Sequence, residues 1–405
     1  MRGIFLTLLC GAAGMTIGLM ITRPDTSIVE ARAQEAVESS QRDRLVAAFE
    51  RIRANYVDEP DQSELVTAAI NGMIGVLDSQ SVYLDWKTFR DLQIHDRRTG
   101  LGLEVIMEQG SVRVIAPIDG SPAATAGIMV NDVITHIDGV PLQGLTIYQV
   151  VEKMRGAVKT NVRLAILRDG HDKPLELTAV RQNISMRSVR MCLVGDDIGY
   201  IRIAMLNDFT MSAFATGIIE WSYRIPQDQI KGYVLDLRNN PGGFRDVAVS
   251  LADKFLEDEE IVSVRGRNAD IERFNARPGD SIHGKPLIVL INGGSAGGAE
   301  IVAGALQDNK RATVIGSRSF GKGSVQNILH LGGRHGALRL TTGRYFTPSG
   351  KSIDSTGIVP DIEVVQNVLS NPEDDHALKL AYDLLRGVAY NQAFPPSKGA
   401  AAVPR

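Results

Sequence analysis

The residues best suited to chemistry are a lysine and a glutamine that follow a glycine-rich stretch. Lys322 lies in GSRSFGKGS, residues 316–324, and Gln326 follows in a segment that alternates apolar and polar residues. The stretch nearly fits a phosphate-binding loop, but Gly323 stands where that loop needs a hydroxyl group for magnesium. Nucleotide binding is therefore disfavoured. Lys322 is either a solvated loop lysine or a buried amine that acts as a general base, and its glycine and phenylalanine neighbours favour the second role.

A turn of small residues upstream could supply a second part of a site. In NGGSAGGAEIVAGALQD, residues 292–308, an apolar run enters the turn and a helix-like segment leaves it. Such a strand-to-helix corner directs free backbone N–H groups toward whatever lies above it. It can therefore hold a phosphate or an oxyanion, or it can present a nucleophile. The residues of the turn alone leave these alternatives open.

Two further glycine-containing turns could bind negatively charged groups. DLRNNPGG, residues 236–243, ends an apolar run, and the N–H groups of Gly242 and Gly243 could face an oxyanion, although a plain turn has the same sequence. GLGL, residues 100–103, could bind a terminal carboxylate through backbone N–H groups, while the adjoining strand edge accepts a peptide.

The composition excludes several classes of function. The chain has 405 residues, 44% hydrophobic and 22% charged, with a formal net charge of −3, so we expect a globular protein with more than one domain and no nucleic-acid partner. Cys10 and Cys192 are the two cysteines, and Cys10 lies in an N-terminal apolar run, so no intramolecular disulfide is expected in the body of the protein. Neither a metal site nor a cofactor is indicated.

The N-terminus predicts export from the cytoplasm. Arg2 precedes an uncharged, mostly apolar run from Ile4 to Thr22. We expect residues 1–33 to be a signal peptide, cleaved at Ala31–Arg32–Ala33, or a retained membrane anchor, and both alternatives stay open. Either one places the protein in the periplasm or another extracytoplasmic compartment.

The elements that must position these residues lie in a linker and four further regions. Residues 24–40 read as a polar linker, and residues 34–95 as a helical N-terminal region with apolar residues at helical spacing. Residues 96–182 contain short strands with a helix at 146–156. Strands and helices alternate through residues 183–365, which predicts an α/β core with a mostly parallel sheet. Residues 366–405 form a C-terminal helix and a flexible tail.

Together these segments resemble the carboxy-terminal processing peptidases. GLGL followed by SPAATAGIMVNDVITHIDG resembles a PDZ domain, and LDLRNNPGG, EIVAGALQD, SFGKGSVQ, FTPSG and GIVPDIEV follow in the order of that family. The resemblance implies a crotonase-like α/β peptidase core with a PDZ domain and helical terminal regions. It also implies a serine endopeptidase whose PDZ domain binds protein C-termini through Leu101, Gly102 and Leu103. Family members dimerise through terminal helices, here residues 42–56 and 373–390.

The resemblance assigns roles to particular residues, and one of them departs from the pattern. By the motif, Lys322 is the general base and Gln326 positions it, while Gly298 joins Gly242 or Gly243 in the oxyanion hole. The nucleophilic serine of the family lies 25 residues before the lysine, where this chain has Gly297.

Two hypotheses follow from Gly297. In the first, hydrolysis is lost or impaired and binding of C-termini is kept. In the second, Ser295 serves as a substitute nucleophile and the chain remains an active endopeptidase that cleaves exported proteins near their C-termini. Two other segments also depart from the family pattern. LDSQS at 77–81 lacks the proline and histidine that the family tends to have, and RRTGLGL lacks the extra glycines and the aromatic residue usual before the carboxylate loop.

Overall fold

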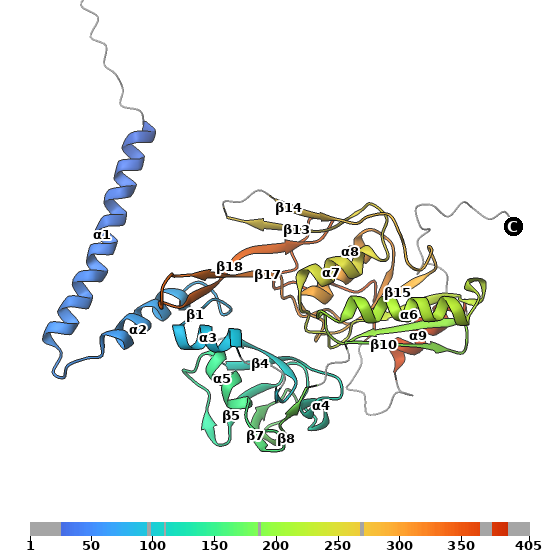
Figure 1. Ribbon diagram of the computed structural model, residues 1–405, viewed down its shortest axis with the longest axis horizontal. Helices are drawn as coiled ribbons and strands as arrows, with labels where there is room; N and C mark the ends of the chain where they lie inside the picture. The colour runs from blue at the N-terminus through green and yellow to red at the C-terminus, as the bar shows by residue number, and fades with distance from the viewer. Residues whose placement is uncertain are drawn as a thin grey trace, which may run out of the picture. The chain divides into compact units, whose positions relative to one another are not determined.

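The computed structural model describes residues 26–94, 99–108, 111–184, 188–267, 271–364 and 375–387. Two compact units are distinguished, residues up to Ala69 and residues from Ile70 onward. The elements are labelled in Figure 1. The predicted signal or anchor, residues 4–22, lies outside the described residues, and no helix in the described ranges is long and apolar enough to cross a membrane.

The N-terminal region is helical, as the apolar spacing predicts. α1 spans Thr26–Asn55 and α2 spans Gln62–Gly75, where the Asp61 carboxylate accepts hydrogen bonds from the N–H groups of Ser63 and Glu64. The prediction of a linker over 24–40 was wrong, because α1 begins at Thr26. Alanine, glutamate and glutamine fill this stretch, and their helix propensity outweighs their polarity. α3, Trp86–Ile94, follows.

The predicted PDZ region folds as a strand-rich module with its own apolar core. Its sheet has the order β3-β4-β5-β7-β8, so β3 is an edge strand. The elements are β3 Leu103–Glu108, β4 Ser111–Pro117, α4 Pro122–Thr125, β5 Val133–Ile137, β6 Val140–Pro141, α5 Ile147–Met154, β7 Asn161–Leu167 and β8 Leu175–Val180. The chain enters and leaves this module through two short paired strands, β2 Thr99–Gly100 and β9 Gln182–Asn183.

The C-terminal core contains the predicted, mostly parallel sheet. Its strand order is β10-β11-β12-β15-β16-β19, and only the pair formed by β10 and β11 is antiparallel. The strands are β10 Val189–Val194, β11 Ile198–Ile203, β12 Gly232–Asp236, β15 Leu287–Ile291, β16 Thr313–Gly316 and β19 Ile362–Glu363. β12 and β15 are apolar along nearly their whole length because both faces of the sheet are covered.

Helices cover the two faces of this sheet (Figure 1). Leu235, Val289 and Ile291 belong to a core shared with α6 Thr210–Arg224, α7 Arg245–Asp253 and α8 Gly298–Asp308. The alternate residues Val234, Ile288 and Leu290 pack against α9, His376–Leu385. A short 3₁₀ helix, Gln227–Gln229, precedes β12. Helices that alternate with strands, and a C-terminal helix, were predicted here, whereas the 3₁₀ turn was not.

A second sheet was not predicted. Its order is β1-β18-β13-β14, and β17 also pairs with β18. The strands are β1 Val82–Leu84, β13 Glu260–Gly266, β14 Glu272–Asn275, β17 Ser324–His330 and β18 Ala337–Phe346. Of these, only β17 was expected as a strand. This sheet carries Gln326, so it contributes directly to the candidate site.

Candidate active site

The predicted corner lies between β15 and α8. The Ser295 side chain closes the turn, because its Oγ accepts a hydrogen bond from Asn292 N at 3.0 Å and donates to Leu237 O at 2.8 Å. Ser295 is fully buried. The proton of this hydroxyl is directed to a backbone carbonyl, so the arrangement argues against Ser295 as a substitute nucleophile, which needs an exposed hydroxyl bonded to a base.

The backbone of Gly297 is strained, but the space beside its Cα is empty. Its φ is +52° and its ψ is −112°, a conformation that L residues rarely adopt. A Cβ atom there would meet Pro241 O at 3.8 Å and Lys322 Cδ at 3.9 Å, and nothing closer. Backbone strain of this kind gathers at catalytic positions, as in the nucleophile elbow. The corner therefore keeps an open space that faces the lysine.

Lys322 points toward the PDZ domain. It lies on the loop between β16 and β17, with its side chain 26% exposed, so it is only partly buried. Its Nζ lies 3.2 Å from Oε1 of Glu104 on β3. The amine is therefore engaged by a carboxylate that was not singled out by the sequence.

Gln326 lies beside the lysine but is held by other groups. Its Nε2 donates to Thr341 Oγ1 at 2.6 Å and to Ser324 Oγ at 3.4 Å. Its Oε1 is buried and makes no hydrogen bond within the part of the chain that the structure describes. That Gln326 positions Lys322 stays a prediction, since the structure places the two residues on one cavity wall without a hydrogen bond between them.

The three predicted oxyanion glycines lie together but differ in their hydrogen bonds. Gly242 N donates to Asn240 Oδ1 at 2.9 Å, whereas the N–H groups of Gly243 and Gly298 have no acceptor among the described residues. A Cβ on Gly242 would lie 2.8 Å from Gly298 N, and a Cβ on Gly243 would lie 1.9 Å from Leu206 O. Only glycine fits either position. The oxyanion role of Gly242, Gly243 and Gly298 stays a prediction, and Gly242 N is already engaged by Asn240.

Glu300, in the first turn of α8, was missed by the sequence reasoning although it fixes the site. Its fully buried carboxylate accepts hydrogen bonds from Gly297 N, Gly321 N and Lys322 N at 2.7–2.8 Å and from Ser319 Oγ at 2.5 Å. Burial raises the pKa of Glu300 to about 7, against the opposing effect of these four donors. One side chain thus ties the elbow to the lysine loop. An acidic residue three positions after a strand-to-helix corner was the available signal.

The predicted carboxylate loop of the PDZ domain is a tight turn whose backbone packs against neighbouring residues. Gly102 has φ +69°, and a Cβ there would lie 2.4 Å from Ser121 Cβ. The carbonyl groups of Leu101 and Gly102 accept hydrogen bonds from Ala123 N and Ile118 N. Their own N–H groups have no acceptor in the described ranges. Leu103, the third predicted residue, begins the edge strand β3.

One cavity of about 640 Å³ connects the PDZ groove with the lysine. Its walls come from the loop at 100–103, β3, α5 and the residues Lys322, Gln326 and Arg339. A peptide that occupies the groove between β3 and α5 would therefore lie against the candidate catalytic residues.

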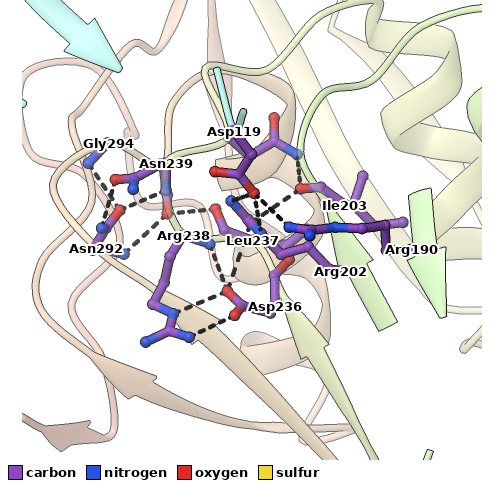
Figure 2. A network of polar contacts seen from close by, with 12 residues as sticks. Asp119, Arg190, Arg202, Ile203, Asp236, Leu237, Arg238, Asn239, Asn292 and Gly294 are labelled. Carbon is purple, nitrogen blue, oxygen red and sulfur yellow. Dashed lines mark hydrogen bonds and ion pairs between the residues drawn. The ribbon is translucent and has the colours of Figure 1, made fainter. Parts of the chain in front are cut away.

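A polar network links the PDZ domain to the strand end beneath the corner (Figure 2). Arg202 is buried, and its Nη2 lies 2.8 Å from Oδ2 of Asp119 in the PDZ domain, while its Nη1 lies 3.7 Å from Oδ1 of Asp236. Asp236 also pairs with Arg238, which contacts Asp375. Burial alone would raise the pKa of Asp236, but Arg202 and Arg238 lower it to about 2.

Comparisons with known proteins decide the family. The profile of peptidase family S41 matches residues 197–364, that of the PDZ domain matches 99–178, and that of the activating protease CtpB N-terminal domain matches 8–88. A carboxy-terminal-processing protease of Bartonella bacilliformis is 45% identical over 387 residues, covering 86% of this chain and 89% of that protein. The chain belongs to the carboxy-terminal processing protease family.

Further members of the family agree with this assignment. The carboxyl-terminal-processing protease of Synechocystis sp. is 35% identical, covering 87% of this chain and 85% of that protein. The solved structure of a photosystem II D1 C-terminal processing protease superposes with a TM-score of 0.69 at 27% identity, covering 86% of this chain and 97% of that one. The predicted family, the fold class and the PDZ domain are confirmed.

Proposed function

We propose that this member of the family binds protein C-termini through its PDZ domain and has lost, or nearly lost, peptide hydrolysis. The observation that carries the proposal is Gly297, which occupies a strained corner 25 residues before Lys322 and leaves open space facing it. Glycine provides no oxygen for an acyl-enzyme. Removal of a protease nucleophile costs on the order of 10⁶ in rate, and oxyanion and binding contributions alone remain.

Binding of C-termini is supported by the free N–H groups of Leu101 and Gly102 and by the unpaired outer edge of β3. A peptide can extend the sheet at this edge and place its carboxylate on the loop. A fluorescent decapeptide with a free carboxylate should bind the full chain at least about tenfold more tightly than its amide, since hydrogen bonds to a charged group are at stake. Equal binding of acid and amide would contradict this part of the proposal.

Hydrolysis is tested with an unfolded protein substrate and product analysis by mass spectrometry. We expect the wild-type chain to cleave no faster than Lys322→Ala. Cleavage that Lys322→Ala abolishes would show that the chain is an active endopeptidase. In that case Ser295→Ala, with its folding checked by circular dichroism, would decide between the buried serine and another nucleophile.

The proposal includes export and self-association. Export, with residues 4–22 as a cleaved signal or an anchor, is supported by the charged start and the apolar run. Fractionation of expressing cells and N-terminal sequencing of the recovered chain test it: a start after Ala33 indicates cleavage, and cytoplasmic recovery contradicts export. Homodimerisation is supported by exposed Leu45, Ile52 and Tyr56 on and just after α1. Light scattering should give a dimer that Leu45→Glu with Ile52→Glu dissociates.

A further inference from the structure

Arg339 on β18 is a cation in the cavity wall that lacks a carboxylate. The two other cationic side chains named on this wall are paired, Lys322 with Glu104 at 3.2 Å and Arg155 with Glu152 at 2.6 Å. Arg339 donates from Nη2 to Gln80 O at 3.1 Å, and its Nε is buried without a partner among the residues that the structure describes. No carboxylate in the described residues forms an ion pair with it.

The guanidinium is oriented by an aromatic ring of the PDZ domain. Its Cζ lies 5.5 Å from the ring centroid of Tyr148 on α5, within the range of a cation–π contact. A guanidinium group offers five donors in a rigid planar fork, which suits a carboxylate held by two hydrogen bonds.

The position of Arg339 along the peptide groove follows from the direction of α5. Arg181 Nε donates to Met154 O at 3.0 Å, and the next residue, Gln182, pairs with Gly100. The C-terminal end of α5 therefore lies beside the carboxylate loop, and Tyr148 lies farther along the groove. The six residues from Tyr148 to Met154 span about 9 Å of helix.

Two steps of an extended peptide, which rises about 3.3 Å per residue, cover about 6.6 Å and three cover about 10 Å, so Tyr148 lies between the third and the fourth residue from the end. Alternate side chains of such a peptide point to the same side, so the last residue and the third from the end both face α5. The last side chain meets the apolar part of the groove near Val151 and Met154. The third from the end lies beside Tyr148 and the guanidinium.

We propose that Arg339 binds the carboxylate of an aspartate or glutamate at the third position from the end of a C-terminal peptide held by the PDZ domain. A residue of the peptidase core thus selects the ligand of the neighbouring domain. This inference rests on the proposed binding of C-termini. It assigns the ligand class as C-terminal peptides with an apolar last residue and an acidic residue two positions before it.

The test uses four fluorescent peptides of one sequence with an apolar last residue. They carry glutamate or glutamine at the third position from the end, each as the free acid and as the amide. With the wild-type chain, the glutamate acid should bind about tenfold or more tightly than the glutamine acid. In Arg339→Gln this difference should vanish, and in Arg339→Lys, which keeps the charge without the fork, it should be partial.

The controls separate this inference from the function on which it rests. If the amides bind as well as the acids, recognition of C-termini itself is wrong. If the acids bind more tightly than the amides but glutamate and glutamine are equivalent in the wild-type chain, Arg339 does not select the ligand. A glutamate moved to the second position from the end, where the side chain faces away from α5, should lose the Arg339-dependent gain. If the Arg339-dependent increase in affinity remained with glutamate at the second position, the proposed role of Arg339 would be wrong.

Discussion

A Cβ atom placed on Gly297 would lie 3.9 Å from Cδ of Lys322. This is an ordinary van der Waals distance, so a small side chain fits the elbow without displacing the lysine loop. The loop and the elbow are held in this relation by the same buried carboxylate, that of Glu300. The elbow and the lysine loop therefore keep their arrangement although the nucleophile is missing. Restoring a hydroxyl group at Gly297 tests this.

Gly297→Ser should convert the chain into a peptidase. The new hydroxyl would lie next to Lys322 and near the free N–H groups of Gly243 and Gly298. We expect cleavage of an unfolded substrate at least about 10³-fold faster than by the wild-type chain, part of the factor of roughly 10⁶ that a nucleophile contributes. Gly297→Ala is the matched control, because it carries the same backbone strain without the oxygen. Activity in the alanine variant, or none in the serine variant, would contradict the prediction.

Releasing Lys322 from the PDZ domain should raise the activity of that variant. Adding Glu104→Gln to Gly297→Ser removes the ion pair with Nζ and frees the amine for the hydroxyl. A partly exposed pair contributes at most about 1 kcal/mol, so kcat should rise up to about fivefold. Glu108→Gln, which alters a pair with Arg113 at the far end of β3, should leave kcat unchanged. A fall in kcat on Glu104→Gln would show that the carboxylate assists the lysine.

Glu300→Ala should destabilise the core strongly. It would leave three backbone N–H groups and the Ser319 hydroxyl without their acceptor, and each buried unsatisfied donor costs about 1–3 kcal/mol. We expect the free energy of unfolding, measured with urea, to fall by at least about 3 kcal/mol. Ser319→Ala removes one of the four donors and leaves Ile358 N, which donates to Ser319 Oγ at 2.6 Å, without its acceptor, so it should cost roughly 2 kcal/mol. Equal losses from the two variants would show that the carboxylate is not the centre of this arrangement.

The buried Asp236 should make stability depend on acidic pH. Its folded pKa is about 2, below the ordinary 3.8, so the unfolded chain binds the proton more readily. The carboxylate of Asp236 therefore contributes its full stabilisation of the folded state above about pH 4, and this stabilisation is lost as the pH falls toward 2. The difference of about two pKa units corresponds to roughly 2 kcal/mol.

Asp236→Asn provides the comparison for that pH dependence. Near neutral pH it should destabilise the protein by about 2–3 kcal/mol, because Arg202 and Arg238 each lose one carboxylate but keep another, Asp119 and Asp375 respectively. The difference in the free energy of unfolding between wild type and variant, measured with urea, should narrow by about 2 kcal/mol between pH 5 and pH 2. If this difference in the free energy of unfolding stays constant between pH 5 and pH 2, Asp236 does not titrate as stated.

Much of the fold could be predicted because its elements carry local signals. The buried run of β15 and the small-residue start of α8 identify the corner. The second sheet carries weaker signals. β1 pairs with β18 across about 250 residues, and such a pairing leaves no trace in the periodicity of either strand.

The candidate site likewise has features that the sequence predicts and features that depend on tertiary contacts. The register between Gly297 and Lys322 is implied by the resemblance to the family, whose nucleophile lies 25 residues before the lysine. By contrast, the pairing of Lys322 with Glu104, the burial of the Ser295 hydroxyl and the bond that occupies Gly242 N depend on segments that meet only in the folded chain. Spacing therefore predicts which positions face each other, and tertiary contacts determine which of their polar groups remain free.

The pairing of β2 with β9 has a consequence for how such a protein is assembled in evolution. Both connections between the PDZ domain and the rest of the chain pass through Thr99–Gly100 and Gln182–Asn183, which lie side by side. The PDZ domain is thus an insertion whose two ends meet at one joint, and the order of strands in the parallel sheet does not depend on it. A change of recognition module at this joint needs no redesign of the core that receives it.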